Sequence, residues 1–230
     1  FHLLGDRALL VKLSERVSVE TNRQVLRIAE TVEKAGVPGL SEAQPAYSSL
    51  CVYFDPSQVR ASWVKQFVAK IIREDEEAGG SIHEEAPPHG RQVEIPVVYG
   101  GDEGPDLESS ALELGISVSE LIARHTFREY RVYMVGFTPG FPYLGGMDES
   151  IALPRLAKPR AKVPPGSVGI GGSQTGVYPW ETPGGWRILG RTGLTLFSPH
   201  EDDPSLLHPG DAVRFVPVSR GDDVLSAPAA

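Results

Sequence analysis

The chain has 230 residues, 40% of them hydrophobic and 23% charged, which suits one large globular domain or two small ones. Its formal net charge of −8 argues against a dedicated nucleic-acid binder, because neutralising phosphates requires clustered Lys and Arg in excess. No apolar run approaches the roughly 20 residues of a membrane span, and no signal-peptide pattern is evident. The single cysteine, Cys51, cannot form an internal disulfide. Together these features favour the cytoplasm.

Two strands and a helix are predicted before residue 55. Residues 6–13 alternate between two faces as a strand does, and residues 48–54 form a second such run. Between them, apolar residues recur at helical spacing behind Ser18, a plausible N-cap, and Gly36 ends that helix.

A second helix follows, and two signals compete for its start. Asp55 offers a cap with Pro56 at the first helical position, while Ser62 is an equally good later start. Its apolar stripe includes Trp63 and Phe67, which we expect in the core. The order strand, helix, strand, helix predicts a small α+β domain with helices on one face of a sheet.

A linker at residues 81–90 then leads to a strand at residues 92–98. Two short helices are predicted next: one starts near Asp106 and stops at Gly115, and the other begins with a capping box at Ser117. The pair superficially resembles a DNA-binding helix-turn-helix. However, it carries six acidic residues and one basic residue, so phosphate would repel it.

The remaining strand candidates are short, at residues 130–135, 168–170, 186–191, 194–197 and 212–218. Brief strands separated by Gly and Pro turns predict a β-barrel or sandwich over residues 90–218. The polar, Ala-rich tail that follows is expected to fray.

The stretch at residues 136–193 holds 21 of the 45 Gly and Pro residues in 58 positions. Gly lets a backbone approach a ligand closely and Pro stiffens a loop, so this composition predicts loops that shape a site. Aromatic rings among the turns predict a groove, or equally anchors that pack the loops on the barrel. The predicted groove lining is Phe137, Pro139, Phe141, Tyr143 and Trp186.

The same stretch holds a concentration of positive charge. Residues 151–191 contain six basic residues and one acidic residue, Glu181. Guanidinium groups amid Gly-rich loops are typical of a small-anion site, although a solvated basic face is an equally good interpretation. Arg187 and Arg191 lie four apart on a predicted strand, so we expect them on one face.

No nucleophile, cofactor or metal fingerprint is evident. The sequence lacks a dinucleotide-binding Gly pattern, a Walker motif and a nucleophile elbow. Its six His residues are scattered, and none pairs with another His, Cys or carboxylate at ligand spacing, so no metal site is expected. Cys51 lies in an apolar strand and is expected to be an inert core thiol.

Four motifs in the second half resemble a known family: GFTPGFPYLGG, VPPGSVGIGGSQTGVYP, PGGWRILGRT and LLHPGDAVRFVPV. GDRALLV and PAYSSLCVYFDP extend the resemblance over the first half. The family is called allophanate hydrolase subunit 1. It includes the B subunit of bacterial ATP-dependent 5-oxoprolinase, the inhibitor of the sporulation histidine kinase, and one subdomain of the urea amidolyase carboxyltransferase. Thr138, Trp180 and Gly193 depart from its usual pattern and are expected to tune a pocket without changing its class.

The resemblance implies an α+β fold in two domains. A ferredoxin-like α+β domain is expected at residues 1–80 and a cyclophilin-like β-barrel at residues 91–218, joined by the linker and followed by a flexible tail at 219–230.

The resemblance also implies a function. The leading hypothesis is a subunit of an ATP-dependent 5-oxoprolinase, inactive alone, whose complex opens 5-oxoproline to glutamate. The implied partners are the homologous subunit 2, which is the C subunit of 5-oxoprolinase, and its A subunit, with a small carboxylate as substrate and ATP as cofactor. In this hypothesis Gln174 and Tyr178 orient the amide, and the anionic oxygens are held by Arg160, Arg187 and Arg191.

Two alternatives remain open. A regulatory module that inhibits a histidine kinase would use the same aromatic, Pro-rich surface. An allophanate hydrolase or urea amidolyase-type carboxyltransferase component would keep the enzyme class, although the chain lacks the Ser-rich amidase signature that allophanate hydrolysis needs.

Overall fold

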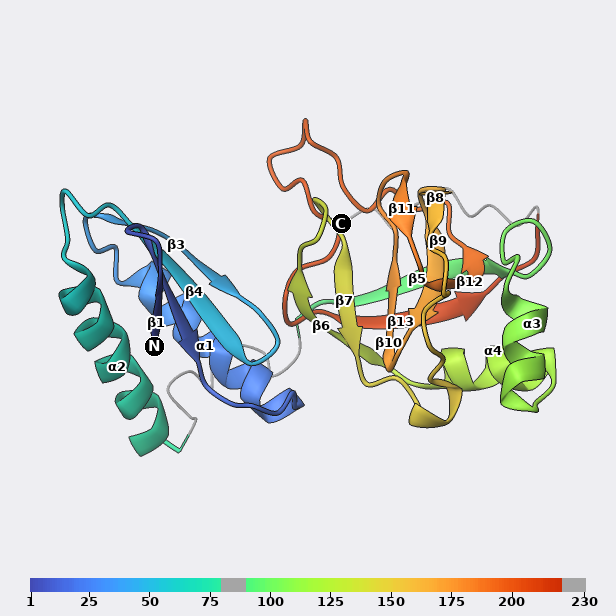
Figure 1. The fold of residues 1–230 in the computed structure, drawn as a ribbon, viewed down its shortest axis with the longest axis horizontal. Coiled ribbons are helices and arrows are strands. Elements are labelled where there is room, and N and C mark those ends of the chain that lie inside the picture. Colours follow the sequence, from blue (N-terminus) through green and yellow to red (C-terminus); the bar gives the residue numbers. More distant parts are fainter. Residues whose placement is uncertain (80–89, 221–230) are drawn as a thin grey trace. The chain divides into compact units, whose positions relative to one another are not determined.

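The protein's structure, a computed structural model, describes residues 1–79 and 90–220. They fall into two compact units, the N-unit (residues 1–79) and the C-unit (residues 90–220), both drawn in Figure 1. The predicted linker, apart from Gly90, and the predicted tail beyond residue 220 lie outside the described residues, so the predicted domain boundaries stay a prediction. None of the described helices combines the length and the apolar composition needed to cross a bilayer.

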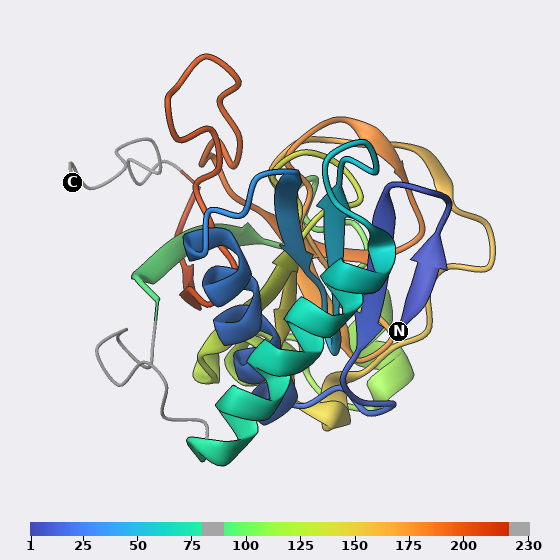
Figure 2. The ribbon, with the colours of Figure 1, turned by 90° about the vertical axis from the view of Figure 1, so that its left-hand side faces the viewer.

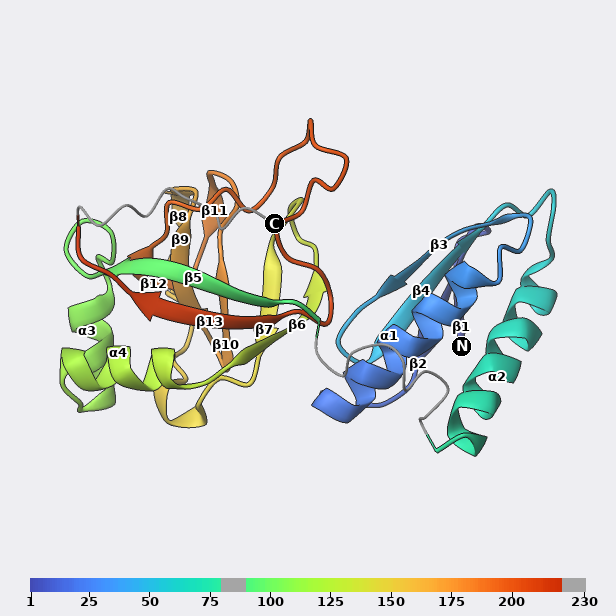
Figure 3. The same cartoon turned by 180° about the vertical axis from the view of Figure 1, so that it is seen from behind.

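The N-unit is a four-stranded antiparallel sheet with two helices on one face, as Figures 2 and 3 show. Its elements are β1 (His2–Leu4), β2 (Ala8–Lys12), α1 (Val19–Lys34), β3 (Leu40–Pro45), β4 (Ser49–Phe54) and α2 (Ala61–Glu77). The strand order is β1-β2-β4-β3. Apolar side chains from alternate strand positions and from both helices, among them Val11, Val52, Ile28 and Val64, form one core.

The predicted strands at 6–13 and 48–54 and the helix behind Ser18 are confirmed. The Ser18 hydroxyl accepts the backbone N–H of Thr21 at 3.1 Å, and Gly36 follows the helix with a φ of 57°. Neither β1 nor β3 was predicted, because both are edge strands without an alternating buried face. All of β1 is exposed, and β3 has one fully buried residue, Ala43.

The second helix starts within one residue of the later predicted position, Ser62, and not at Asp55. It begins at Ala61, after Arg60, whose side chain makes no capping hydrogen bond. Asp55 instead caps a turn, and hydrogen bonds from Gln58 and Ser57 lower the pKa of its carboxyl to about 2. The core prediction for Trp63 is wrong: its side chain is 42% exposed and stacks on the Phe67 ring, with centroids 5.0 Å apart.

The C-unit is a closed barrel of seven strands. Of the two predicted architectures, a barrel or a sandwich, the barrel is confirmed. Its elements are β5 (Gln92–Tyr99), α3 (Leu107–Leu114), α4 (Val118–Phe127), β6 (Tyr130–Val135), β7 (Pro142–Gly145), η1 (Glu149–Ile151), β8 (Arg160–Val163), β9 (Ser167–Gly171), β10 (Gln174–Val177), β11 (Thr182–Gly184), β12 (Arg187–Arg191) and β13 (Ala212–Pro217). The barrel order is β10-β7-β6-β13-β5-β12-β9. β5 and β13 pair in parallel, side by side in Figure 3, and the other barrel pairs are antiparallel.

Helices α3 and α4 pack against one end of the barrel (Figures 1 and 3). The predicted signals are confirmed: Gly115 ends α3 with a φ of 68°, and the Ser117 hydroxyl accepts the N–H of Glu120 at 3.1 Å. From α4, Leu121 reaches the barrel core, as does His125. The His125 ring is fully buried between Tyr99 and Thr175, and burial lowers its pKa to about 3.

Most C-unit strand predictions are confirmed, but the one at residues 194–197 is wrong. There the backbone N–H of Leu194 donates to the Thr192 hydroxyl, and only Phe197 forms an isolated bridge, to Ser205. Four short strands were not predicted: β7, β10 and β11 contain Gly or Pro residues that give the pattern of turns, and β8 is four residues long between Pro159 and Pro164. β8 and β11 pair with each other outside the barrel ladder.

Candidate functional site

The Gly-rich stretch packs aromatic rings directly against strand backbones. A Cβ atom on Gly171 of β9 would lie 2.3 Å from the indole nitrogen of Trp186, and one on Gly184 would lie 2.5 Å from the phenol oxygen of Tyr178. Both distances are too short for a side chain. These glycines therefore make room for the protein's own rings, which explains part of the composition that predicted a site.

The rings form a cluster centred on Phe141. Its centroid lies 5.0 Å from Tyr143, 5.3 Å from Tyr178, 5.5 Å from Trp186 and 5.6 Å from Phe137, each in an edge-to-face arrangement. Phe141, Tyr178 and Trp186 are buried, whereas Phe137 is 65% exposed. Edge-to-face pairs are worth roughly 0.5 to 1.5 kcal/mol each beyond the area they bury, so the cluster is a rigid surface.

Phe137 occupies an unusual backbone conformation. Its φ is 68°, and every other described residue with a positive φ is a glycine. The tight turn around it is closed by hydrogen bonds from Thr138 N–H to the Gly136 carbonyl (2.8 Å) and from Phe141 N–H to the Thr138 carbonyl (3.0 Å). The left-handed region costs an L residue roughly 1 to 2 kcal/mol, so the turn holds an exposed ring in place at the expense of stability.

Together with Arg155, these five rings line a pocket of about 270 Å³, here called the aromatic pocket. Burial raises the pKa of Tyr178, and a hydrogen bond from the Trp186 backbone and the positive charge of Arg155 act in the opposite direction. Burial likewise raises the pKa of Tyr143, opposed again by Arg155. The guanidinium of Arg155 therefore acts electrostatically on two phenols of the same pocket.

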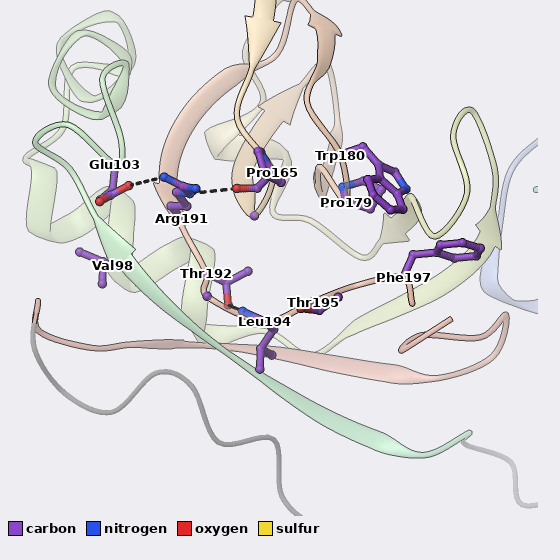
Figure 4. Close-up of a pocket in the computed structure, with 12 residues that line it drawn as sticks. Val98, Glu103, Pro165, Pro179, Trp180, Arg191, Thr192, Leu194, Thr195 and Phe197 are labelled. Carbon is purple, nitrogen blue, oxygen red and sulfur yellow. Dashed lines mark hydrogen bonds and ion pairs between the residues drawn. The ribbon is translucent and has the colours of Figure 1, made fainter. Parts of the chain in front are cut away.

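A larger pocket of about 500 Å³, here called the loop pocket, lies beside Arg191 and Trp180 (Figure 4). Arg191 donates from Nε to the Pro165 carbonyl (2.9 Å) and lies 3.5 Å from the Glu103 carboxylate, so its guanidinium is already engaged. Trp180 and Gly193, two of the three departures from the family pattern, line this pocket.

The loop at residues 136–141 links the two pockets. The Trp180 indole donates to the Pro139 carbonyl at 3.1 Å on the loop-pocket side, while Phe137 and Phe141 face the aromatic pocket. Thr138, the third departure, lies in this loop. The first motif singled out in the sequence therefore lines the aromatic pocket and, through the Pro139 carbonyl, holds one residue of the loop pocket.

The predicted cationic patch is largely neutralised by acidic residues from distant segments. Arg160 lies 2.6 Å from the buried Asp106, Arg187 lies 2.7 Å from Glu113, and Arg191 pairs with Glu103. Lys162 pairs with Glu181 at 2.7 Å. The partners of the three arginines come from α3 and the loop before it, so a count of charges within residues 151–191 could not include them.

The expectation that Arg187 and Arg191 share a face is wrong. β12 carries a bulge between Ile188 and Gly190, so Arg187 is paired with Ile170 of β9 but Arg191 with Ser167. Cross-strand partners point to the same side of a sheet, and residues three apart on β9 point to opposite sides. The two guanidiniums accordingly reach different acidic partners.

The structure thus brings together Phe137, Phe141, Tyr143, Tyr178 and Trp186 of the predicted site, but Pro139 and Gln174 line neither pocket. Arg155 was not singled out by the sequence. The available signal was its place in a loop between Pro154 and Pro159, outside the strands whose arginines pair with acids.

Among the described residues, no group of three or more His, Cys, Asp or Glu side chains is arranged to hold a metal ion. His208 Nε2 lies 2.8 Å from the Asp203 carboxylate, which is one hydrogen-bonded pair and not a set of metal ligands. Cys51 is partly buried rather than a core thiol.

Comparisons with known proteins cover most of the chain. Residues 1–207 match the family model described as carboxyltransferase domain, subdomain C and D. The B subunit of 5-oxoprolinase from Bacillus subtilis (strain 168) is 45% identical over 222 residues, covering 95% of this chain and 92% of the relative. The B subunit of 5-oxoprolinase from Escherichia coli O157:H7 is 42% identical over 220 residues, covering 96% of each.

Two solved structures extend the comparison to the fold. TTHA0988 matches with a TM-score of 0.79 at 37% identity, over 93% of this chain but 40% of its own chain. The Kluyveromyces lactis urea amidolyase matches with a TM-score of 0.71 at 20% identity, over 93% of this chain and 14% of its own, and this likeness shows the fold alone.

Proposed function

Because the chain belongs to the family described as carboxyltransferase domain, subdomain C and D, we propose that it is the B subunit of a 5-oxoprolinase. The observation that carries the proposal is the match to two curated relatives of that name, each more than 40% identical and covered over more than nine tenths of its length. We further propose that the N-unit is ferredoxin-like and the C-unit cyclophilin-like, as the resemblance implies.

The proposed reaction is the ATP-dependent opening of the 5-oxoproline lactam to glutamate in the cytoplasm. The chain acts with two further polypeptides: a homologous partner, which corresponds to the C subunit of 5-oxoprolinase, and the A subunit. The relatives' designation as B subunits supports this dependence. The match covers 40% of the TTHA0988 chain, so TTHA0988 carries further sequence joined to the matched region. We take this as support for a second polypeptide that acts together with this chain.

Within the chain, we place the substrate at the aromatic pocket. Its apolar walls suit the ring of 5-oxoproline, and the Tyr178 phenol, whose pKa burial raises, is a neutral hydrogen-bond donor for a carbonyl oxygen. The volume of about 270 Å³ is just below the roughly 300 Å³ at which small-molecule pockets usually begin, which suits a single-ring ligand. The partner protein supplies the general base.

Coexpression tests the proposal. The chain is produced alone, with its C-subunit homologue, and with both the C and the A subunits, and each preparation is assayed for 5-oxoproline-dependent ATP hydrolysis and glutamate formation. We expect both activities in the full set and neither in the chain alone. A stable complex that consumes ATP but forms no glutamate from 5-oxoproline would contradict the proposal, and capture of a histidine kinase in place of the C-subunit homologue would favour the regulatory alternative.

A further inference from the structure

Arg155 is the cationic side chain of the aromatic pocket. It is exposed, and it makes no hydrogen bond or ion pair with another described residue. Its charge nevertheless acts on the phenols of Tyr143 and Tyr178, so it lies at the pocket rather than in remote solvent.

Other cations of the stretch behave differently. Arg160, Arg187 and Arg191 each contact a carboxylate and also a backbone carbonyl, at Trp186, Pro154 and Pro165 respectively. Their donors are used to fix loops and strands. Arg155 differs from these three arginines because it lines the aromatic pocket and its guanidinium N–H groups donate to no other described residue.

The surroundings of Arg155 select the chemistry of a ligand. A cage of aromatic rings alone would suit a cation, but the positive charge of Arg155 disfavours a cation in this pocket. The fork of a guanidinium matches a carboxylate, with two parallel N–H···O hydrogen bonds. The rings leave room for a flat, apolar body, and Phe137, held exposed at a φ of 68°, has its ring available to cover one.

We propose that Arg155 binds the carboxylate of a small, ring-shaped acid whose apolar body lies among Phe137, Phe141 and Trp186. This inference rests on the proposed function, which makes the acid 5-oxoproline. The carboxylate is the part of that substrate that does not react, so Arg155 is a binding and specificity residue. Its role is to hold the ring in one orientation while the partner's groups act on the lactam.

The test compares 5-oxoproline with 5-oxoprolinamide, which keeps the ring but lacks the negative charge. Binding is measured by calorimetry for the full chain, alone and with its partner proteins, as wild type, Arg155→Gln and Arg155→Lys. Arg214→Gln is the matched control, because Arg214 is exposed on β13 and lines neither pocket.

We expect Arg155→Gln to weaken 5-oxoproline binding by about 10- to 100-fold, the usual loss for a hydrogen bond between charged groups, while 5-oxoprolinamide binding changes less than about twofold. Arg155→Lys should retain part of the preference, since it keeps the charge but loses the fork. In the active complex, Arg155→Gln should raise KM for 5-oxoproline more than it lowers kcat, and Arg214→Gln should match the wild type.

Three outcomes would overturn the inference: no binding of 5-oxoproline by wild type in either preparation, an unchanged preference for the acid in Arg155→Gln, or an equal loss in Arg214→Gln. Failure of the proposed function is distinguishable. It would appear as a wild-type complex that forms no glutamate, even where Arg155 still selects the acid over its amide.

Discussion

Phe137 shows at the scale of one residue how this protein keeps a strained backbone beside a pocket. A φ of 68° destabilises the folded state by roughly 1 to 2 kcal/mol for an L residue compared with glycine. Part of this difference is offset because glycine gives the unfolded chain more conformational entropy. The exposed ring buries little surface that would offset this cost.

We therefore expect Phe137→Gly to be more stable than Phe137→Ala by about 1 kcal/mol, because only glycine relieves the strain. Both variants should bind 5-oxoproline several-fold more weakly than wild type, because both lose the ring. Urea denaturation with calorimetry on the same samples measures the two effects. An alanine variant as stable as the glycine variant would show that the turn is unstrained.

A second residue-scale prediction concerns pH and His125. Its pKa is lowered to about 3 by burial, whereas a histidine in the unfolded chain titrates near 6.5. Below pH 6.5 the unfolded state therefore binds a proton that the folded state does not. The free energy of unfolding should fall by roughly 1.4 kcal/mol per pH unit on this account as pH decreases from 6.5 toward 3.

The measurement is denaturant unfolding of the C-unit between pH 4.5 and 7, compared with His125→Gln. Carboxylates contribute equally to both proteins, so the difference in slope isolates His125. His200→Gln, which removes an exposed histidine, should retain the wild-type slope. Parallel curves for wild type and His125→Gln would refute the assignment.

At the scale of secondary-structure elements, one ion pair joins the two helices of the N-unit. Arg27 of α1 donates to both carboxylate oxygens of Asp75 of α2, at 2.7 and 3.0 Å, and the Asp75 side chain is 4% exposed. Removing Asp75 leaves the partly buried Arg27 guanidinium, whose side chain is 25% exposed, without its carboxylate, and this costs more than the pair itself contributes.

Asp75→Ala should therefore lower the free energy of unfolding of the N-unit by about 3 kcal/mol. Glu74→Ala is the matched control on the same helix. It removes an exposed pair with Lys70 and should cost under about 0.5 kcal/mol, because solvent screens that pair. Equal losses in both variants, measured in urea, would mean that burial of the pair has no role.

At the scale of the whole molecule, the described residues form two units with separate hydrophobic cores. Because each core lies within one unit, we expect calorimetry of the full chain to resolve two unfolding transitions. Asp75→Ala should lower the temperature of one, and His125→Gln the temperature of the other. A single transition that both variants shift would show that the units unfold together.

The sequence by itself determined what depends on local pattern. Alternation and helical periodicity located α1, β4, β5, β6 and the caps at Ser18 and Ser117, because those elements bury a face defined by their own residues. Where burial came from edges, bulges or Gly-rich backbone, as in β3, β7 and β10, local pattern was silent. The residues of four motifs, in their order along the chain, were enough to indicate the family.

The tertiary structure alone decided which charges are available to a ligand. Sequence reasoning found the aromatic rings, since rings among Gly and Pro stay near one another along the chain. It assigned the anion to Arg160, Arg187 and Arg191, whose acidic partners lie far back along the chain. Asp106 lies 54 positions before Arg160, and Glu103 lies 88 positions before Arg191. A charge is neutralised by what lies within a few ångströms in space, so only the fold could leave Arg155 as the cation at the aromatic pocket.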